Sequence, residues 1–520
     1  MRIQRKPFLG RKAFAVLLLQ ASLACRAYAQ LGSSGSSSQG ATVNQLPLSG
    51  RTATASQGGS VSVTQSPVPG VTTTVNTINP TVQVQGNYSG GVSGAPFSGK
   101  LSLQEALQRG LRYNLGAVGL GLAERQAQGQ NRTVRSALLP NINGSLSETV
   151  QQVDLAASGI RIRTPIPGFS FPTIVGPFNF FDLRARLSQS VVDLTAWNNY
   201  RSSSEVVRAN QLSLADARDL VVLAVAGSYL QVITAAARVD SARAQLDTAT
   251  ALYDQTAQQR KVGLVAQVDV DRSEVQMLTQ KQRLVSLQND LAKQKINLAR
   301  ITGLPPTDQY EVSDVAPFSA SPGMTVEDAL QQATKQRSDL KAAEAQIRAA
   351  ERTVSAAHAE RYPSLAINGD YGVIGVNPAQ SHGTFSVSGT LRLPLWQGGR
   401  VEGDIVQANA AAAQRRAEAD DLHRQIEADV RNAFLDLQAA ASQVEVAERN
   451  VQVTKETLEL TRQKFQAGVT DNVEVVQAQS SLASADLDYI NSVFAHNLAK
   501  LSLGRATGTL STTLPQTGHF

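Results

Sequence analysis

The 520-residue sequence predicts a mixed α and β membrane protein built from two tandem copies of one unit. Three observations support this prediction: a repeated sequence, very long segments with helical periodicity, and shorter segments with strand periodicity. We consider the repeat first, because an internal duplication sets the architecture of the whole chain.

The repeat is clearest at the end of each copy. Residues 297–303 (Asn-Leu-Ala-Arg-Ile-Thr-Gly) return 205 positions later as residues 502–508 (Ser-Leu-Gly-Arg-Ala-Thr-Gly). Upstream, residues 101–107 match residues 324–330, and Pro140 matches Pro363, at an offset of 223. The difference, 223 − 205, indicates 18 extra residues in the first copy, around 155–180. We therefore assign residues 99–303 to repeat 1, 304–323 to a connection, 324–508 to repeat 2 and 509–520 to a tail.

Residues 1–29 have the pattern of a secretory signal peptide, with a basic start, an apolar core and an Ala27-Tyr28-Ala29 cleavage site. The alternative is lipoprotein processing at Cys25, the only cysteine. The segment contains six basic residues and no acidic ones, while the full chain has 48 Lys+Arg against 42 Asp+Glu. The mature chain is therefore near neutral, which gives no support for nucleic-acid binding. Once Cys25 is removed with the signal peptide, the mature chain contains no cysteine, which excludes disulfides and thiol catalysis.

Residues 30–98 are rich in Gly, Ser, Thr, Gln and Asn and carry almost no charge. Such a composition buries too little apolar surface to offset chain entropy, so it predicts a low-complexity flexible linker. Residues 81–85 (Thr-Val-Gln-Val-Gln) alternate, and they allow a second interpretation, a short strand docked on the body.

Two stretches without proline, Thr195–Leu304 and Val401–Leu514, exceed the length of ordinary globular helices and predict coiled coils. A strict heptad pattern of this kind implies left-handed supercoiling. Breaks at 262–266 and 467–471 predict the turn of each helical hairpin. The 3-4 spacing in the second copy runs through Val430, Ala433, Leu437, Ala440, Val444, Ala447, Val451, Thr454, Leu458, Thr461 and Phe465.

Strand pairs are predicted at about 140–192 and 363–396. Phe385, Val387, Gly389 and Leu391 alternate with polar residues, and the same alternation recurs within 142–150, 181–188 and 364–373. One apolar and one polar face fit strands of a transmembrane barrel, and no apolar run in the mature chain suggests a membrane helix. Four strands cannot close a barrel, so several subunits would share one, and three would supply twelve strands. The alternative is a small soluble antiparallel sheet.

Over about residues 100–510 the chain resembles the TolC family of outer-membrane efflux and secretion channels. The resemblance rests on the duplicated helix–hairpin–helix unit, on the Pro394–Arg400 exit from the last strand and on the Val262–Ala266 break. The Ser190–Leu194 counterpart of that exit departs from the pattern, and a linker as long as 30–98 is not a common family feature. The resemblance implies a homotrimer with a shared twelve-stranded β-barrel, four strands per subunit, in the outer membrane. It also implies a periplasmic tunnel of twelve helices, with residues 303–323 near its waist.

The resemblance further implies two sets of site residues at the helical turns. Small and apolar residues would receive the hairpin tip of a periplasmic adaptor protein, since a partner helix can approach glycine closely. Charged residues would constrict the aperture, where a ring of carboxylates favours cations. The adaptor-binding candidates are Val262, Gly263, Leu264, Ala467, Gly468 and Val469. The aperture candidates are Asp269, Asp271, Arg272, Asp471 and Glu474.

Both sets have simpler interpretations. A glycine between helices can be only a helix stop, and the charges can be solvated surface residues. Gln477 and Thr470 stand where the family pattern has charged residues, so Asp471 and Arg272 are the candidates to replace them in a closing network.

The predicted function is an outer-membrane exit duct of a tripartite efflux or type I secretion system, which passively conducts substrates from an adaptor and an inner-membrane pump to the exterior. Nothing predicts an enzyme, a cofactor or a metal site, because the five histidines lack metal-ligand spacing. Predicted partners are further copies of the chain, the adaptor, the pump and outer-membrane lipid, but not nucleic acid. The alternatives are a periplasmic coiled-coil scaffold or adaptor without a barrel and a trimeric surface adhesin. The sequence does not identify the cargo.

Overall fold

The computed structural model describes residues 61–67, 78–157, 159, 172–307, 309–314, 318 and 323–511. They all belong to one compact unit, Ser49–Phe520. The predicted signal peptide, Cys25 and the tail beyond Ser511 lie outside the described residues.

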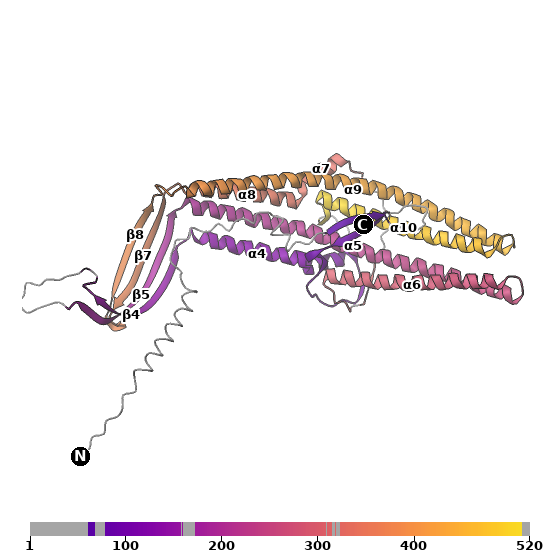
Figure 1. Ribbon diagram of the computed structural model, residues 1–520, viewed down its shortest axis with the longest axis horizontal. Coiled ribbons are helices and arrows are strands. Elements are labelled where there is room, and N and C mark those ends of the chain that lie inside the picture. The colour runs from indigo at the N-terminus through magenta and orange to yellow at the C-terminus, as the bar shows by residue number, and fades with distance from the viewer. Residues whose placement is uncertain are drawn as a thin grey trace, which may run out of the picture. The chain divides into compact units, whose positions relative to one another are not determined.

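The two copies contain the same elements in the same order (Figure 1). The first copy comprises α3 (Leu103–Tyr113), α4 (Leu115–Ser136), β4 (Asn141–Asp154), β5 (Ile174–Val192), α5 (Leu194–Lys261) and α6 (Gln267–Thr302). The second comprises α7 (Val326–Gln336), α8 (Ser338–Ala359), β7 (Ser364–Gly375), β8 (Ser381–Arg392), α9 (Arg400–Gln466) and α10 (Asn472–Thr507). Helices α4 and α8 both have 22 residues, α6 and α10 both have 36, and α5 and α9 have 68 and 67. The predicted duplication is confirmed.

The long helices pack side by side in a fixed order. Helix α5 packs against α4, α6, α8 and α10, whereas α9 packs against α8 and α10. Near the sheet the order is α4, α5, α8, α9, and toward the helical turns it is α6, α5, α10, α9 (Figure 1). Helix α9 therefore forms one edge of the helical layer, and α4 and α6 form the other.

The heptad prediction is confirmed along the middle of α9, where Val430, Ala433, Leu437, Ala440, Val444 and Ala447 are all buried. The first copy has a more continuously apolar core, centred on Val221, Val225 and Tyr229 of α5. One 18-residue window of α5 is long and apolar enough to cross a membrane, so the prediction that the mature chain has no such run is wrong. Because 72% of the window is buried inside the unit, it has the character of a core helix.

The four strands form one antiparallel sheet in the order β4-β5-β7-β8, so the two copies meet where β5 pairs with β7. Leu187 lies opposite Ile142 and Gly369 in this register. Strand β8 ends at Arg392, earlier than the predicted exit. Strand β5 begins at Ile174, so part of the insertion predicted as a loop at 155–180 is strand, while residues 158 and 160–171 lie outside the described part.

The predicted flexible linker is wrong for its described part. Strands β1 (Val61–Pro67) and β2 (Ile78–Val84) pair, and β2 packs against α10 and α5. The short 3-10 helix η1 (Gly86–Ser89) follows, with Tyr88 buried. The alternative of a docked strand is therefore observed. The composition argument failed because this segment needs no core of its own and packs on the helices instead.

Short strands also tie the beginning of repeat 1 to the connection between the copies. Strand β3 (Gly99–Leu101) pairs in parallel with β6 (Tyr310–Val312). The Tyr229 hydroxyl of α5 donates to the backbone oxygen of Leu101 at 2.7 Å, and burial raises the pKa of that hydroxyl above its ordinary value. This region fixes the middle of α5, from which the long hairpins extend to their turns.

Candidate functional site

The turn between α5 and α6 is built on a glycine in the left-handed region. Gly263 has φ of +78°, its N–H donates to Arg260 O at 3.0 Å, and Leu264 N–H donates to Gln259 O at 2.9 Å. A side chain at this φ is strained, so glycine stops the helix at low cost. The turn leaves Val262 and Leu264 more than 70% exposed, at 71% and 74%. The glycine is thus a helix stop that also displays two apolar side chains to solvent.

The turn between α9 and α10 repeats this arrangement. Gly468 has φ of +72°, its N–H donates to Phe465 O at 3.1 Å, and Val469 is 75% exposed. At both glycines the space where a Cβ would stand is open. The two copies therefore present equivalent turns with small and apolar surfaces, and every predicted adaptor-binding residue lies on them.

The structure brings the two turns into contact. The buried Asn472 side chain donates from Nδ2 to the backbone oxygen of Asp269 at 3.1 Å. Val270 and Val475, at equivalent positions of α6 and α10, are also buried. The aperture candidates of the two copies are thus neighbours, although 203 residues separate Asp269 from Asn472.

The charged candidates have different environments. Arg272 Nη1 lies 3.2 Å from Asp269 Oδ1, and both side chains remain partly exposed. Gln267 donates to Asp271 at 2.8 Å. Glu474, the equivalent of Asp269 in repeat 2, is exposed. An ion pair at this exposure contributes on the order of 1 kcal/mol or less, so Asp269 can exchange Arg272 for another partner at little cost.

Asp471 has a structural role that the sequence argument missed. Its Oδ1 accepts hydrogen bonds from Val473 N at 3.0 Å and Glu474 N at 3.3 Å, which makes it the N-cap of α10. Helix α6 has Ala266 at this position and no side-chain cap. A replacement of Asp471 would therefore weaken the start of α10 as well as alter the charge of the aperture.

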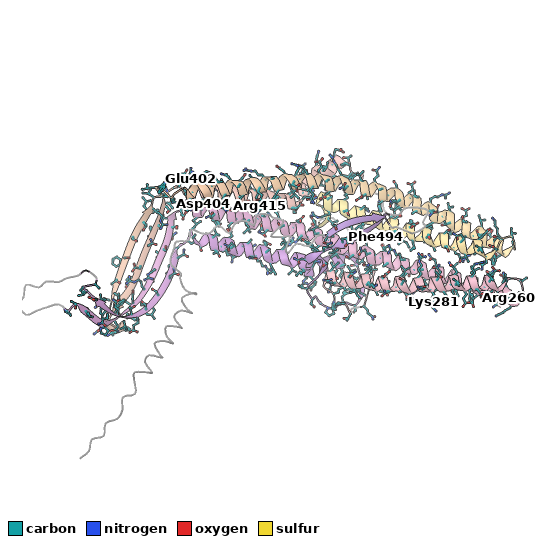
Figure 2. All side chains as sticks on the ribbon, in the orientation of Figure 1. Arg260, Lys281, Glu402, Asp404, Arg415 and Phe494 are labelled. Carbon is teal, nitrogen blue, oxygen red and sulfur yellow. The ribbon has the colours of Figure 1, made fainter. Side chains whose placement is uncertain are left out.

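Two further residues that sequence reasoning missed hold the α5–α6 hairpin near its turn. The buried hydroxyls of Thr256 and Ser273 lie 2.6 Å apart. Arg260, at the same end of α5, donates to Val265 O at 3.5 Å (Figure 2). The available signal for Thr256 is its offset of 205 from Thr461, a polar residue within the 3-4 pattern of the second copy, whereas Ser273 lies on no such pattern. Among the described residues no group of three His, Cys, Asp or Glu is placed to hold a metal.

The opposite end of the helices carries the sheet, near Glu402 and Asp404 at the start of α9 (Figure 2). One face of the sheet is polar: Arg184 of β5 pairs with Asp370 of β7, and Ser386 of β8 also contacts Asp370. Large apolar side chains of the other face are exposed in the single chain. They include Ile142, Leu146, Leu183, Leu187, Tyr371, Phe385, Val387 and Leu391.

Comparison with known proteins gives a consistent result. The family model for "Outer membrane efflux protein" matches residues 115–304 and 329–509, which together make up more than half of the chain. Outer membrane protein TolC of Vibrio cholerae is 26% identical over 386 residues, covering 72% of this chain and 84% of TolC. The pyoverdine export outer membrane protein OpmQ of Pseudomonas aeruginosa is 25% identical over 425 residues, covering 79% and 85%.

Solved structures share the fold. The Campylobacter jejuni CmeC outer membrane channel superposes with a TM-score of 0.68 at 16% identity, over 83% of this chain and 95% of that one. The Vibrio cholerae outer membrane protein VceC superposes with a TM-score of 0.65 at 18% identity, over 78% and 96%.

Proposed function

This chain belongs to the outer membrane efflux protein family, and on that basis we propose that it is the exit duct of a tripartite efflux or type I secretion system. It lies in the outer membrane and passively conducts substrates from a periplasmic adaptor and an inner-membrane pump to the exterior. One observation carries the proposal: a sheet with an exposed apolar face stands at one end of helices roughly 100 Å long. The relatives are channel proteins and not enzymes.

The functional unit in this proposal is a homotrimer with a shared twelve-stranded β-barrel. The support is that β4 and β8 are edge strands, each with one side of its backbone unpaired within the described sheet. Since about eight strands are needed to enclose side chains, one chain cannot close a barrel. The apolar face meets lipid, and the polar face with Arg184 and Asp370 lines a water-filled lumen.

The strand exit of repeat 2 has the composition of a membrane boundary. Leu395 and Trp396 follow β8 and are 93% and 89% exposed. Aromatic side chains gather at the two interfaces of transmembrane barrels. This exposure supports a boundary between the barrel and the periplasmic helices at the end of β8.

The helical turns serve as the docking site of the adaptor. Val262, Gly263 and Leu264 form one half, and Ala467, Gly468 and Val469 form the equivalent half. The open space above both glycines suits the close approach of an adaptor hairpin. The export signal at 1–29 and the connection at 304–323, near the waist of the tunnel, complete the proposed organisation.

The aperture of the duct lies beside these turns. Three copies of Asp269 and Glu474 form the constriction, with Asp271, Arg272 and Asp471 around them. Because carboxylate rings attract cations, the resting duct favours cations and is blocked by divalent ions.

Single-channel recording tests this function directly. Reconstituted protein should form channels, and the Asp269→Ala, Glu474→Ala double variant should conduct more and be blocked less by Mg²⁺. Asp290→Ala is the matched control, because Asp290 is an exposed acid of α6 away from the turn. No channels at all would contradict the duct, whereas channels with unchanged block would remove the two acids from the aperture.

A further inference from the structure

A cavity of about 310 Å³ lies between the two helical hairpins of one chain. Its walls come from α5 and α6 of repeat 1 and from α9 and α10 of repeat 2, where the four helices run side by side (Figure 1). Along α10 it extends from Gln479 to Ile490, roughly 17 Å. It begins four residues beyond Arg272 and five residues beyond Glu474, and none of the adaptor or aperture candidates lines it.

Three glutamine side chains in the cavity wall have buried carbonyl oxygens that accept no hydrogen bond from the described residues. They are Gln245 of α5, Gln280 of α6 and Gln479 of α10. Gln280 and Gln479 are only 7% and 8% exposed. The amide nitrogen of Gln245 donates to Ser241 Oγ at 3.1 Å, so the oxygen is the unpartnered atom of that side chain. Buried acceptors without a donor are costly, and folded proteins supply the partner from protein, water or a ligand.

Comparison of the two copies shows that helix packing does not require one of these amides. The position 205 residues after Gln280 holds Ala485, which is 1% exposed. Alanine has a higher helix propensity than glutamine and buries no polar group. The equivalent of Gln479 in repeat 1 is Glu274, which is exposed to solvent. The buried amides are therefore specific to this cavity, and their retention favours a role in holding a ligand.

The cavity wall is acidic. Asp486 of α10 contributes a carboxylate, and the lining, all of it within the described residues, contains no Lys, Arg or His. Burial raises the pKa of Asp486, and the positive charge of Lys455 offsets part of that rise. Lys455 lines a neighbouring cavity instead of this one. Because burial disfavours the charged carboxylate, a cation inside the cavity would be stabilised by Asp486 and would stabilise it in return.

The remaining wall is apolar. Leu458 of α9 and Leu482 and Ile490 of α10 line the cavity together with the ring of Tyr489. A hard metal ion requires about six oxygen ligands, which this wall does not supply. Apolar walls instead suit the hydrocarbon part of an organic ligand, and an aromatic face attracts its positive charge.

We propose that this cavity binds a small organic ammonium ion, whose N–H groups donate to the Asp486 carboxylate and to the glutamine amide oxygens. An ammonium group carries up to three donors and no acceptor, which complements a wall with three unpartnered carbonyl oxygens and one carboxylate. The hydrocarbon part packs against Leu458 and Leu482. The volume is at the lower end of the range for ligand pockets, so the ligand is small.

The ligand would connect the two repeats, because its partners lie on α6 and on α10. The inference goes beyond the proposed exit duct and does not depend on it, since the whole cavity lies within one chain. Failure to form channels would contradict the duct and leave the binding site untouched, so the two failures are distinguishable.

Isothermal titration calorimetry of the full-length protein in detergent tests the ligand class. The probe is 2-phenylethylammonium, and the matched ligand is 2-phenylethanol, which has nearly the same shape but no charge. Titration into detergent alone corrects for partition into micelles. The ammonium should bind, and the alcohol should bind about tenfold more weakly or less. Absence of ammonium binding, or equal affinity for the two compounds, would overturn the proposal and leave water as the partner of the amides.

Variants of the wall test the position of the site. Asp486→Asn removes the charge at nearly constant volume and should weaken ammonium binding by about tenfold. Gln280→Ala, which copies Ala485, should weaken it by about threefold. The matched control is Asp247→Asn, because Asp247 is an exposed acid of α5 at the same level that does not line the cavity. Thermal unfolding checks that each variant is folded. Equal ammonium affinity in Asp486→Asn and Asp247→Asn would overturn the site.

Thiol protection locates the ligand without altering Asp486. Ala244→Cys introduces a thiol into the cavity wall, and Asp247→Cys introduces one outside it. The ammonium should slow the reaction of Ala244→Cys with a small neutral methanethiosulfonate, leave Asp247→Cys unchanged, and protect more than 2-phenylethanol does. The wild type, with Cys25, is the blank. Equal reaction rates of Ala244→Cys with and without the ammonium would contradict the proposal.

Discussion

The junction between the two short helices is stabilised by an uncharged amide in repeat 1 and by a charged side chain in repeat 2. Asn114 joins α3 to α4, and Arg337, 223 residues later, joins α7 to α8. Both are buried, at 0% and 5% exposed. The Asn114 amide donates to Tyr88 O at 2.9 Å and accepts from Gly116 N at 2.9 Å. Arg337 pairs with Asp339 at 2.6 Å and with Asp429 at 3.1 Å.

The difference follows from what covers each junction. In repeat 1 the cover is the segment before β3, where Val92 N donates to Tyr113 O and Gly94 N donates to Gly303 O. In repeat 2 the backbone and the Cγ atom of Arg337 lie against Gly508, the equivalent of Gly303. Residues 88–94 are therefore part of the repeat 1 fold, and a charged network takes their place in repeat 2.

The largest effect should come from removing the buried charge. Arg337→Ala leaves Asp339 and Asp429 without their partner, and we expect a loss of about 3 kcal/mol in the free energy of unfolding. Arg348→Ala removes an ion pair to Glu205 that is 39% exposed on the arginine side, and it should cost about 1 kcal/mol or less. Denaturant unfolding in detergent measures both. Equal losses would show that the Arg337 network is only a surface feature.

The glycines that end each copy give the next comparison. An added Cβ at Gly303 would stand 2.6 Å from Val92 O, and at Gly508 it would stand 3.0 Å from Arg337 N. Both have positive φ, which alone costs roughly 1–2 kcal/mol for alanine. Thermal unfolding should therefore rank Gly303→Ala as most damaging, then Gly508→Ala, then Gly263→Ala, where space is open. Equal losses of thermal stability for Gly303→Ala and Gly263→Ala would mean that residues 88–94 move away from the added Cβ at little energetic cost.

Asn114→Ala tests the cover of repeat 1. It removes a buried amide that is hydrogen-bonded to Tyr88 and caps α4, so we expect a loss of about 1–3 kcal/mol. Hydrogen exchange should also accelerate at Val92 and Gly94. Ser102→Ala, which removes only the cap of α3, is the control and should leave that exchange unchanged. Unchanged hydrogen exchange in Asn114→Ala would show that residues 88–94 are not part of the repeat 1 fold.

The smallest expected effect is a pH dependence that arises at Asp339 in repeat 2. Burial alone would raise the pKa of Asp339, but the hydrogen bond and charge of Arg337 hold it below its usual value. A depressed pKa contributes stability above the unfolded value of about 3.9, which is lost as pH falls through the folded pKa. Asp339→Asn should therefore lose less stability than the wild type between about pH 5 and pH 3. Parallel pH profiles would contradict the pairing.

The sequence predicted the parts of the fold that have a period. The offset of 205 placed both turns, and the heptad pattern placed the buried face of α9, because both depend on local geometry that every turn repeats. The strand alternation located the sheet but not its ends: β5 reaches back to Ile174 within an apparent loop. No local sequence signal marks the end of the β4–β5 hairpin, because its length is set by the pairing between the two strands.

The features that the sequence did not predict depend on tertiary contacts between distant parts of the chain. The cover of the Asn114 junction by residues 88–94 depends on helices far away in the sequence, and a composition argument cannot detect it. At the candidate site, the turns were predicted from the paired glycines, whereas the link from Asn472 to Asp269 joins two copies and has no local signal. The capping role of Asp471 did have a local sequence signal, since an aspartate directly before the start of a helix is a common N-cap. The roles of the site residues in adaptor binding and constriction stay predictions.

Electron microscopy of protein extracted in detergent from the outer membrane tests the central claim most directly. The account predicts a three-fold particle in which a detergent-covered end, containing the sheets, continues into a tunnel of roughly 100 Å formed by the long helices. Particles without a detergent belt, or monomeric particles in which protein covers the sheet, would contradict this account.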